Sequence, residues 1–300
     1  MASAAHASVS SPQRSPSSLT EPKLHSAPLG SFGAELRDFS IARDLDDNNF
    51  PAIEALFYRA HLLVLRGQSL TPQQFHHWAR RFGRPEPHVI NQFHHREIPD
   101  ILWLSNVVKD GVPQGLADAG TYFHTDYSYL AKVARATTLY SIEVPRVGGN
   151  TLFADQTAAW DDLSGAMKAQ IDGLRVRHHY GNRDDLNERS RTVASVLSDE
   201  QKGRVDWVVH PLVMTHWYTG RKALYSVSGS SFEIEGMGER EGRELLDELK
   251  HHSTQPRYQV SVSYGVGDVV LWDNLALLHS ATLTDPSMPR TLWRVTVKAP

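Results

Sequence analysis

The sequence predicts a mainly β fold: an antiparallel barrel or double-sheet jelly roll with helical additions. Residues 258–264 and 291–298 alternate between apolar and polar side chains, as strands with one buried face do. Between them, an apolar run at 269–272 follows a turn at Gly267 and Asp268, which predicts a buried strand. Helical spacing of apolar residues occurs at the start of the chain and in isolated insertions, so we expect the helices to be additions to a β core.

Further elements follow from local patterns along the chain. Thr71 and Pro72 form a good N-cap and first-residue pair for a helix that stops at Gly83. The remaining predictions, in chain order, are a helix at 50–60, a strand at 61–66, the helix at 71–82, a strand at 101–104, and helices at 161–174 and 239–251.

Residues 1–28 are rich in serine and proline and contain no apolar run. Such a segment cannot bury enough surface to offset its chain entropy, so we expect a disordered tail. Residues 29–300 contain no linker and are predicted to form a single domain. The tail is poor in acids, as organelle transit peptides are, but a plain extension of a cytoplasmic protein is the favoured interpretation.

Composition limits the kinds of site and partner. The chain has no cysteine, which excludes a disulfide scaffold, a zinc finger, an iron–sulfur site and a thiol nucleophile. It has sixteen histidines, so any metal ligands would be nitrogen and oxygen atoms. A net charge of −3 argues against nucleic acid or an anionic membrane as partner, and no apolar stretch has the length of a membrane span.

A candidate metal site is formed by His124, Asp126 and His279. Residues two apart in an extended strand point to one face, so His124 and Asp126 can occupy adjacent positions on a metal ion. Considered alone, His124 and Asp126 are most simply interpreted as surface or hydrogen-bonding residues. Considered alone, His279 is most simply interpreted as a core histidine. Together they make a two-histidine, one-carboxylate set, typical of non-haem Fe(II) oxygenases, with positions open for a bidentate 2-oxo acid and dioxygen.

Arg290 and Arg294 follow in an alternating segment, where residues 290, 292 and 294 are predicted to share one strand face. Two guanidinium groups facing a barrel interior need anions, so the pair predicts either a bound carboxylate or buried Asp or Glu partners. An arginine so placed can hold the distal carboxylate of a 2-oxo acid by charge-assisted hydrogen bonds.

Several of these segments resemble the TauD/TfdA family of Fe(II)- and 2-oxoglutarate-dependent oxygenases. The resemblance covers about residues 29–298 and rests on motifs in the family's order. They are H-T-D at 124–126, G-G-N-T at 148–151, H-P-L-V-M-T-H at 210–216, T-G-R-K-A-L-Y at 219–225, W-D-N at 272–274, His279, Arg290 and Arg294. The resemblance implies a double-stranded β-helix, a jelly-roll core like that of the cupins.

The resemblance also implies residue roles. It makes His124, Asp126 and His279 the iron ligands, while Thr151 contacts one end of 2-oxoglutarate and Arg290 grips the other. Arg294 resembles a residue that faces the anionic group of the primary substrate, and Asn106 lies where substrate contacts occur. Asn150 stands where the family usually has Asp, and Tyr129 where it commonly has Phe, which could put a hydroxyl near the pocket.

The sequence thus predicts an Fe(II)- and 2-oxoglutarate-dependent dioxygenase that uses dioxygen to hydroxylate a small organic substrate bearing a carboxylate, sulfonate or sulfate. Succinate and CO2 would be co-products, and a homo-oligomer, dimer or tetramer, is expected. One alternative keeps the cofactors but catalyses desaturation, cyclisation or epimerisation in a biosynthetic pathway. Another is a non-catalytic jelly-roll binding protein. Zinc hydrolysis is disfavoured because no zincin-like general base accompanies the set. Specificity is expected to reside in loops 85–123 and 180–208.

Overall fold

The computed structural model describes residues 24–117, 120–180, 197–227 and 231–298, and its largest sheet has eight strands. All neighbours in this large sheet are antiparallel except the β2–β3 pair. Its strands are, in order across the sheet, β1 (His25–Pro28), β2 (Ala34–Arg37), β3 (Leu62–Leu65), β16 (Val269–Asp273), β8 (Ala134–Glu143), β18 (Thr291–Lys298) and β4 (Arg84–Pro85), with β5 (Leu102–Ser105) also paired to β18.

A small three-stranded sheet faces the large one. It consists of β15 (Gln259–Val262), β9 (Thr151–Asp155) and β17 (Leu277–Ala281). Shorter sheets lie at the periphery: β11 (Val208–Pro211), β10 (Arg175–His178) and β14 (Ser231–Ile234); β12 (Val213–Thr215) and β13 (Lys222–Leu224); β6 (Val108–Lys109) and β7 (Val112–Pro113).

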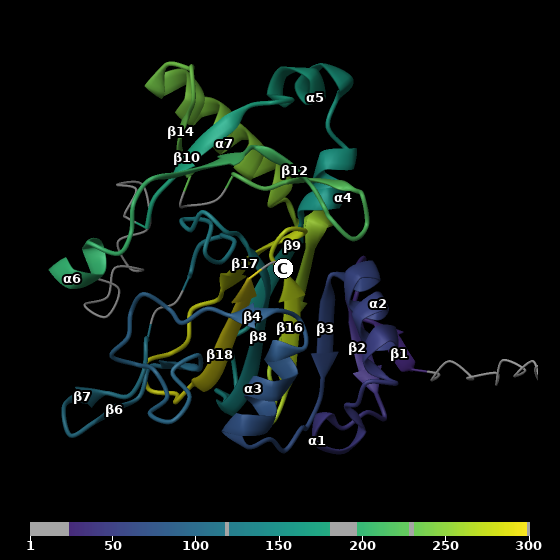
Figure 1. Ribbon diagram of the computed structural model, residues 1–300, viewed down its shortest axis with the longest axis vertical. Helices are drawn as coiled ribbons and strands as arrows, with labels where there is room; N and C mark the ends of the chain where they lie inside the picture. Colours follow the sequence, from purple (N-terminus) through teal and green to yellow (C-terminus); the bar gives the residue numbers. More distant parts are fainter. Residues whose placement is uncertain (1–23, 118–119, 181–196, 228–230, 299–300) are drawn as a thin grey trace, which may run out of the picture.

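The helices in the described part of the chain are α1 (Ile41–Asp44), α2 (Phe50–Ala60), α3 (Pro72–Arg80), α4 (Gln156–Asp161), α5 (Gly165–Ile171), α6 (Asp199–Lys202) and α7 (Glu239–Ser253), with a 3-10 turn at Pro256–Tyr258. Figure 1 shows α4, α5 and α7 gathered at one end of the molecule, away from α1, α2 and α3. None of these helices combines the length and the apolar character that crossing a membrane requires.

The two faces of the large sheet are buried against different partners, as period-two alternation requires. In β16, Val270 and Trp272 point inward and pack with Phe153 and Leu277 of the small sheet. The intervening residues, Val269 and Leu271, point outward and pack with α2 and α3. The space between the two sheets is therefore an apolar core, and inward-facing polar residues within it stand out.

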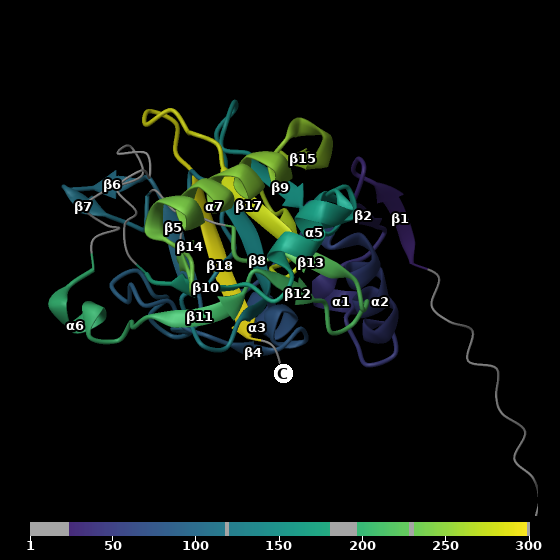
Figure 2. The same cartoon turned by 90° about the horizontal axis from the view of Figure 1, so that it is seen from above.

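The small sheet is covered on its other face by helices. Ala154 of β9 and Leu278 of β17 pack against Trp160 of α4 and against Leu245 and Leu249 of α7. Figure 2, seen from above, shows α7 lying over β17 and β9. The order helix, sheet, sheet, helix is that of a jelly roll with helical additions, which confirms the predicted fold class.

Most predicted elements are confirmed, at 50–60, 62–65, 72–80, 102–105, 239–253, 259–262, 269–273 and 291–298. The prediction of one helix over 161–174 is wrong. Helix α4 ends at Asp161, where the predicted helix was to begin, and only the shorter helix α5, capped anew by Ser164, lies within the predicted range.

The predicted boundary of the N-terminal tail is also wrong. Strand β1 at His25–Pro28 pairs with β2 inside the segment assigned to the tail, so the folded part begins before residue 29. Composition does not reveal the backbone pairing that the neighbouring strand Ala34–Arg37 supplies. Residues 1–23 and 181–196, which include most of the predicted tail and part of one predicted specificity loop, lie outside the described residues.

Candidate active site

His124, Asp126 and His279 converge at the interior of the jelly roll. The Nε2 atom of His124 lies 3.9 Å from Asp126 Oδ1, and that of His279 lies 3.7 Å from Asp126 Oδ2. One ligand atom from each residue lies within 4.8 Å of the others. These separations are too long for hydrogen bonds, and they surround a point from which a metal ion can reach all three at about 2 Å after a small closure.

The backbone brings the two histidines together. His124 and His279 form an isolated antiparallel bridge, in which each N–H donates to the other's carbonyl at 2.9 and 2.8 Å. The predicted strand through His124 and Asp126 is wrong, because the chain turns after His124 and Tyr127 has a φ of 56°. The turn, together with the bridge, rather than strand alternation, places Asp126 beside both rings.

The protonation of the two rings fits a metal. His124 Nδ1 lies 2.8 Å from the Tyr122 carbonyl, to which it can only donate, so the lone pair is on Nε2, the atom that faces Asp126. Burial lowers the pKa of His279 to about 3 and also lowers the pKa of His124, which favours the neutral rings that metals bind. Burial opposes the charge of Asp126, but His279, Arg294 and His124 outweigh it and hold its pKa below the ordinary value.

Gly120 leaves room for the first ligand. Its φ is +77°, and a Cβ there would lie 2.1 Å from Cε1 of His124. Only glycine adopts this backbone conformation without strain and also allows the imidazole to occupy that space. The close approach fixes where the His124 ring can lie.

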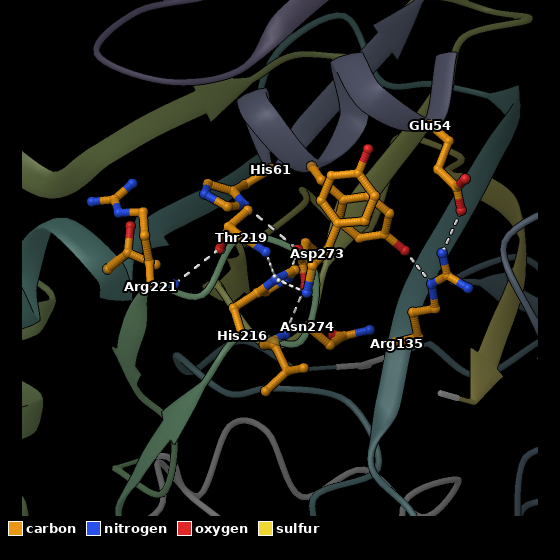
Figure 3. A network of polar contacts seen from close by, with 12 residues as sticks. Glu54, His61, Arg135, His216, Thr219, Arg221, Asp273 and Asn274 are labelled. Carbon is orange, nitrogen blue, oxygen red and sulfur yellow. Dashed lines mark hydrogen bonds and ion pairs between the residues drawn. The ribbon is translucent and has the colours of Figure 1, made fainter. Parts of the chain in front are cut away.

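A second cluster of the same residue types consists of His61, His216 and Asp273, also buried and within 4.8 Å. Figure 3 shows His216 and Asp273 at the centre of this network. His216 Nδ1 accepts the backbone N–H groups of Tyr218 and Thr219 at 3.2 and 3.1 Å, so its proton is on Nε2, which donates to Asp273 Oδ2 at 2.7 Å. This ring offers no lone pair toward Asp273, and the cluster does not fit a metal ion as the first one does.

The second cluster instead stabilises a buried carboxylate. Burial disfavours the charge on Asp273, but the His216 and His61 imidazoles lower its pKa to about 2. Asp273 also accepts the Leu275 N–H at 3.0 Å through its other oxygen. The partners of His216 therefore give it a structural role.

Arg290 lies just before β18, not within it, and its guanidinium diverges from that of Arg294. Its Nε donates to the Gly149 carbonyl at 3.2 Å, and its guanidinium carbon lies 5.6 Å from the Tyr264 ring centre. Tyr264 OH lies 2.8 Å from Thr151 Oγ1. Among the described residues, no carboxylate forms an ion pair with Arg290, although burial lowers its pKa. A partly buried cation and a threonine hydroxyl that both contact Tyr264 are suited to a bound carboxylate.

Asn106 supports the Arg290 segment. Its Oδ1 accepts the Arg290 N–H at 2.8 Å, and its Nδ2 donates to the Met288 carbonyl at 2.9 Å. Both hydrogen-bonding ends of the side chain are therefore used within residues 288–290. Its predicted contact with substrate stays a prediction.

Arg294 shares the inward face of β18 with Leu292, as predicted, and reaches the metal-ligand cluster. Its Nη1 lies 3.5 Å from Asp126 Oδ1, and its Nη2 is buried without a hydrogen-bond partner among the described residues. Asp126 is thus the buried acidic partner that the sequence left open as one of two possibilities. The Nη2 end of the Arg294 guanidinium therefore has N–H groups that can donate to a bound anion.

Aromatic rings surround Arg294. Its guanidinium carbon lies 5.8 Å from the Tyr127 ring, Tyr127 and Tyr129 are 5.8 Å apart, and Tyr129 and Tyr180 are 4.6 Å apart. His88 completes the group, with its ring 5.8 Å from Tyr127. Tyr264, Tyr180 and His88 were not identified from the sequence, because no spacing links them to the ligands. Tyr127 and Tyr129, which flank the ligand segment, were equally plausible from the sequence as core or as pocket-wall residues.

The chain is similar to several known proteins over most of its length. The family described as "Taurine catabolism dioxygenase TauD, TfdA family" matches residues 25–296. The alpha-ketoglutarate-dependent 2,4-dichlorophenoxyacetate dioxygenase of Cupriavidus pinatubonensis is 34% identical over 278 residues, which cover 88% of this chain and 94% of that protein. Pentalenolactone F synthase of Streptomyces arenae is 31% identical, with 89% and 92% covered. The crystal structure of AAD-2 with Mn(II) and N-oxalylglycine superposes with a TM-score of 0.76 at 27% identity, covering 93% of this chain and 98% of that chain.

Proposed function

Since the chain belongs to the TauD/TfdA family, we propose that it hydroxylates a small organic anion at the site between its two sheets. Its family and its relatives identify it as a 2-oxoglutarate-dependent dioxygenase, which uses Fe(II), 2-oxoglutarate and dioxygen. In the proposed reaction one oxygen atom of O2 enters the substrate as hydroxyl and the other enters succinate. The 2-oxoglutarate loses its carboxyl group as CO2.

In this proposal His124, Asp126 and His279 bind Fe(II). The bound iron supplies the oxidising chemistry, in which dioxygen is reduced at the expense of 2-oxoglutarate and a substrate C–H bond. The chain supplies two neutral imidazoles and one charged carboxylate on one side of the ion. Three protein ligands leave room for a bidentate 2-oxo acid and for dioxygen.

Arg290 and Thr151 are proposed to hold the distal carboxylate of 2-oxoglutarate. The supporting observation is that the partly buried Arg290 guanidinium forms no ion pair with a described carboxylate. Thr151 presents its hydroxyl on the inward face of β9, next to the Tyr264 ring that lies by Arg290. A charge-assisted hydrogen bond from Arg290 orients the co-substrate.

The observation that carries the substrate class is the free end of Arg294. Its Nη2 is buried and unpartnered among the described residues, while its Nη1 lies beside a proposed iron ligand. Leaving a guanidinium N–H unpaired in the interior is costly, and a substrate carboxylate, sulfonate or sulfate removes that cost. The relatives named for 2,4-dichlorophenoxyacetate and (S)-phenoxypropionate act on aryloxy acids, and the rings of Tyr127, Tyr129 and Tyr180 suit an aryl group.

The test is a panel of acids given to protein loaded anaerobically with Fe(II) and 2-oxoglutarate. Succinate release is measured after oxygen is added, for aryloxyacetates, aryl sulfonates and the corresponding neutral amides. We expect acids, not amides, to stimulate succinate release. If no acid raises release above the uncoupled background, a small anionic substrate is wrong.

An Arg294→Met variant sharpens this test. Removing one partner of a buried charge pair costs about 2 kcal/mol or more, so KM for the acid should rise about thirtyfold or more. Arg294→Lys keeps the positive charge and should be impaired less. Equal KM values for the acid in wild type and Arg294→Met would remove Arg294 from substrate binding.

A second candidate outcome is supported by the similarity to pentalenolactone F synthase, a biosynthetic enzyme by its name. It keeps the same iron ligands and co-substrate but ends in desaturation, cyclisation or epimerisation. Product mass separates these outcomes, because hydroxylation adds one oxygen atom and desaturation removes two hydrogen atoms.

A further inference from the structure

We propose that Thr137 is a positioning residue that occupies one oxygen of Asp126, so that this carboxylate gives the metal a single oxygen ligand. The inference rests on the proposed function, in which Asp126 binds Fe(II). Thr137 belongs to β8, is fully buried, and donates its hydroxyl proton to Asp126 Oδ2 at 2.6 Å. None of the sequence motifs that predicted the site contains it.

The neighbours of Thr137 direct its hydroxyl proton to Asp126 when the Thr296 hydroxyl acts as donor. Its oxygen accepts the side-chain N–H of Asn274 at 3.0 Å and lies 3.0 Å from the Thr296 hydroxyl. A threonine oxygen has two lone pairs and one proton, so these two contacts use both lone pairs when Thr296 donates. The hydroxyl proton of Thr137 is then left to donate, and its acceptor is Asp126 Oδ2.

Asn274 fixes the same carboxylate from the backbone side. Its Oδ1 accepts the Asp126 N–H at 3.3 Å and the Trp272 indole N–H at 3.1 Å, and its carbonyl accepts the Thr125 hydroxyl at 2.7 Å. Asn274 follows Asp273, which the His216 network anchors (Figure 3). The second cluster of histidines and aspartate therefore supports the clamp behind Asp126.

The hydrogen bond from Thr137 limits the number of coordination positions on the metal that the Asp126 carboxylate can occupy. Oδ1 is the oxygen nearer to His124 Nε2, at 3.9 Å, and Oδ2 is the one nearer to His279 Nε2, at 3.7 Å. Since Thr137 donates to Oδ2, Oδ1 is the oxygen left free of that hydrogen bond for the metal. A carboxylate with both oxygens free can chelate a metal, which would take a position that a bidentate 2-oxo acid and dioxygen need. Outer hydrogen bonds of this kind orient metal ligands.

The experiment compares three variants in the Mn(II)-loaded protein, which binds 2-oxoglutarate without turnover. Thr137→Val removes the hydroxyl at nearly constant volume, and Thr137→Ser restores it. Thr138→Val makes the same change in the next residue, which is equally buried but faces α3 and accepts the Trp78 indole N–H at 3.3 Å. Calorimetric titration gives the dissociation constants of 2-oxoglutarate and of Mn(II).

We expect Thr137→Val to raise the dissociation constant of 2-oxoglutarate by about tenfold, because a chelating Asp126 would compete for a position that the co-substrate needs. Its Mn(II) affinity should change less, and Thr137→Ser should bind 2-oxoglutarate nearly as wild type does. Thr138→Val should lower the urea midpoint but keep the wild-type affinity. Unchanged 2-oxoglutarate binding in Thr137→Val, an equal loss in Thr138→Val, or no rescue by serine overturns the inference. If the wild-type protein itself does not bind 2-oxoglutarate in a metal-dependent way, the proposed function fails first.

Discussion

Replacing Tyr264 with phenylalanine removes one oxygen atom from the proposed 2-oxoglutarate subsite. Tyr264 OH lies 2.8 Å from Thr151 Oγ1, and its ring lies 5.6 Å from the guanidinium carbon of Arg290. A carboxylate only accepts hydrogen bonds, so Thr151 must give its single proton to bound 2-oxoglutarate. Tyr264 is then the donor to Thr151, and its loss leaves the threonine oxygen without that donor.

The size of the effect follows from that one contact. A neutral hydrogen bond contributes about 0.5 to 1.5 kcal/mol, which corresponds to about a two- to twelvefold change in a dissociation constant. The phenylalanine ring keeps the position beside Arg290, so the aromatic contact is retained. We therefore expect KM for 2-oxoglutarate to rise within that range, and KM for the primary substrate to stay at the wild-type value.

The assay is succinate formation at saturating substrate with 2-oxoglutarate varied. Tyr140→Phe is the matched control, because Tyr140 is also buried and hydrogen-bonded but packs on the outer face of the large sheet. The reasoning is refuted if Tyr264→Phe leaves KM for 2-oxoglutarate unchanged, or if Tyr140→Phe raises it equally.

Three further predictions concern Gly120, His216 and His178. Gly120→Ala should weaken Mn(II) binding about tenfold or more, because its Cβ would lie 2.1 Å from Cε1 of His124; wild-type affinity by calorimetry would contradict this. His216→Ala should lower the free energy of unfolding in urea by about 3 kcal/mol, because it leaves the buried Asp273 carboxylate without its imidazole donor; a loss under 1 kcal/mol would count against that role. Burial lowers the pKa of His178 to about 3 against an unfolded value near 6.5, so the unfolded chain binds the proton first as pH falls and stability decreases between about pH 6 and 4. In metal-free protein, His178→Gln should reduce that slope by about 1.4 kcal/mol per pH unit, and an unaltered slope in urea titrations would exclude the residue as its source.

Local pattern was sufficient for the elements whose environment is uniform along their length. Strands β16 and β18 alternate between the two faces of one sheet, and α2 buries one face against that sheet, so spacing alone predicts them. Residues 161–174 were mispredicted because a new cap at Ser164 interrupts a region with helical propensity throughout. The segment around His124 was mispredicted as a strand because its only ladder contact is a single bridge to His279.

The candidate site shows a similar division. Residue types and spacing pointed to His124, Asp126 and His279, and to Arg290 with Thr151 once the family resemblance was added. Thr137 and Tyr264 carried no signal, because a threonine or tyrosine in a strand is ordinary and only its long-range partners give it a role. Arg290 and Arg294 were expected on one strand face, but Arg290 precedes β18 and turns toward Gly149.

The sequence by itself determined the fold class, the chemistry of the available ligands and the residues able to supply them. It pointed to His124, Asp126 and His279, but it did not reveal that His61, His216 and Asp273 form a second buried cluster of the same residue types. The tertiary structure separates the two clusters through the Nδ1 partners of one histidine in each. The Tyr122 carbonyl leaves a lone pair on Nε2 of His124, whereas the backbone N–H groups of Tyr218 and Thr219 place the proton of His216 on its Nε2. Those partners lie within three residues of each ring in the chain, but the turns that aim them exist only in the folded protein.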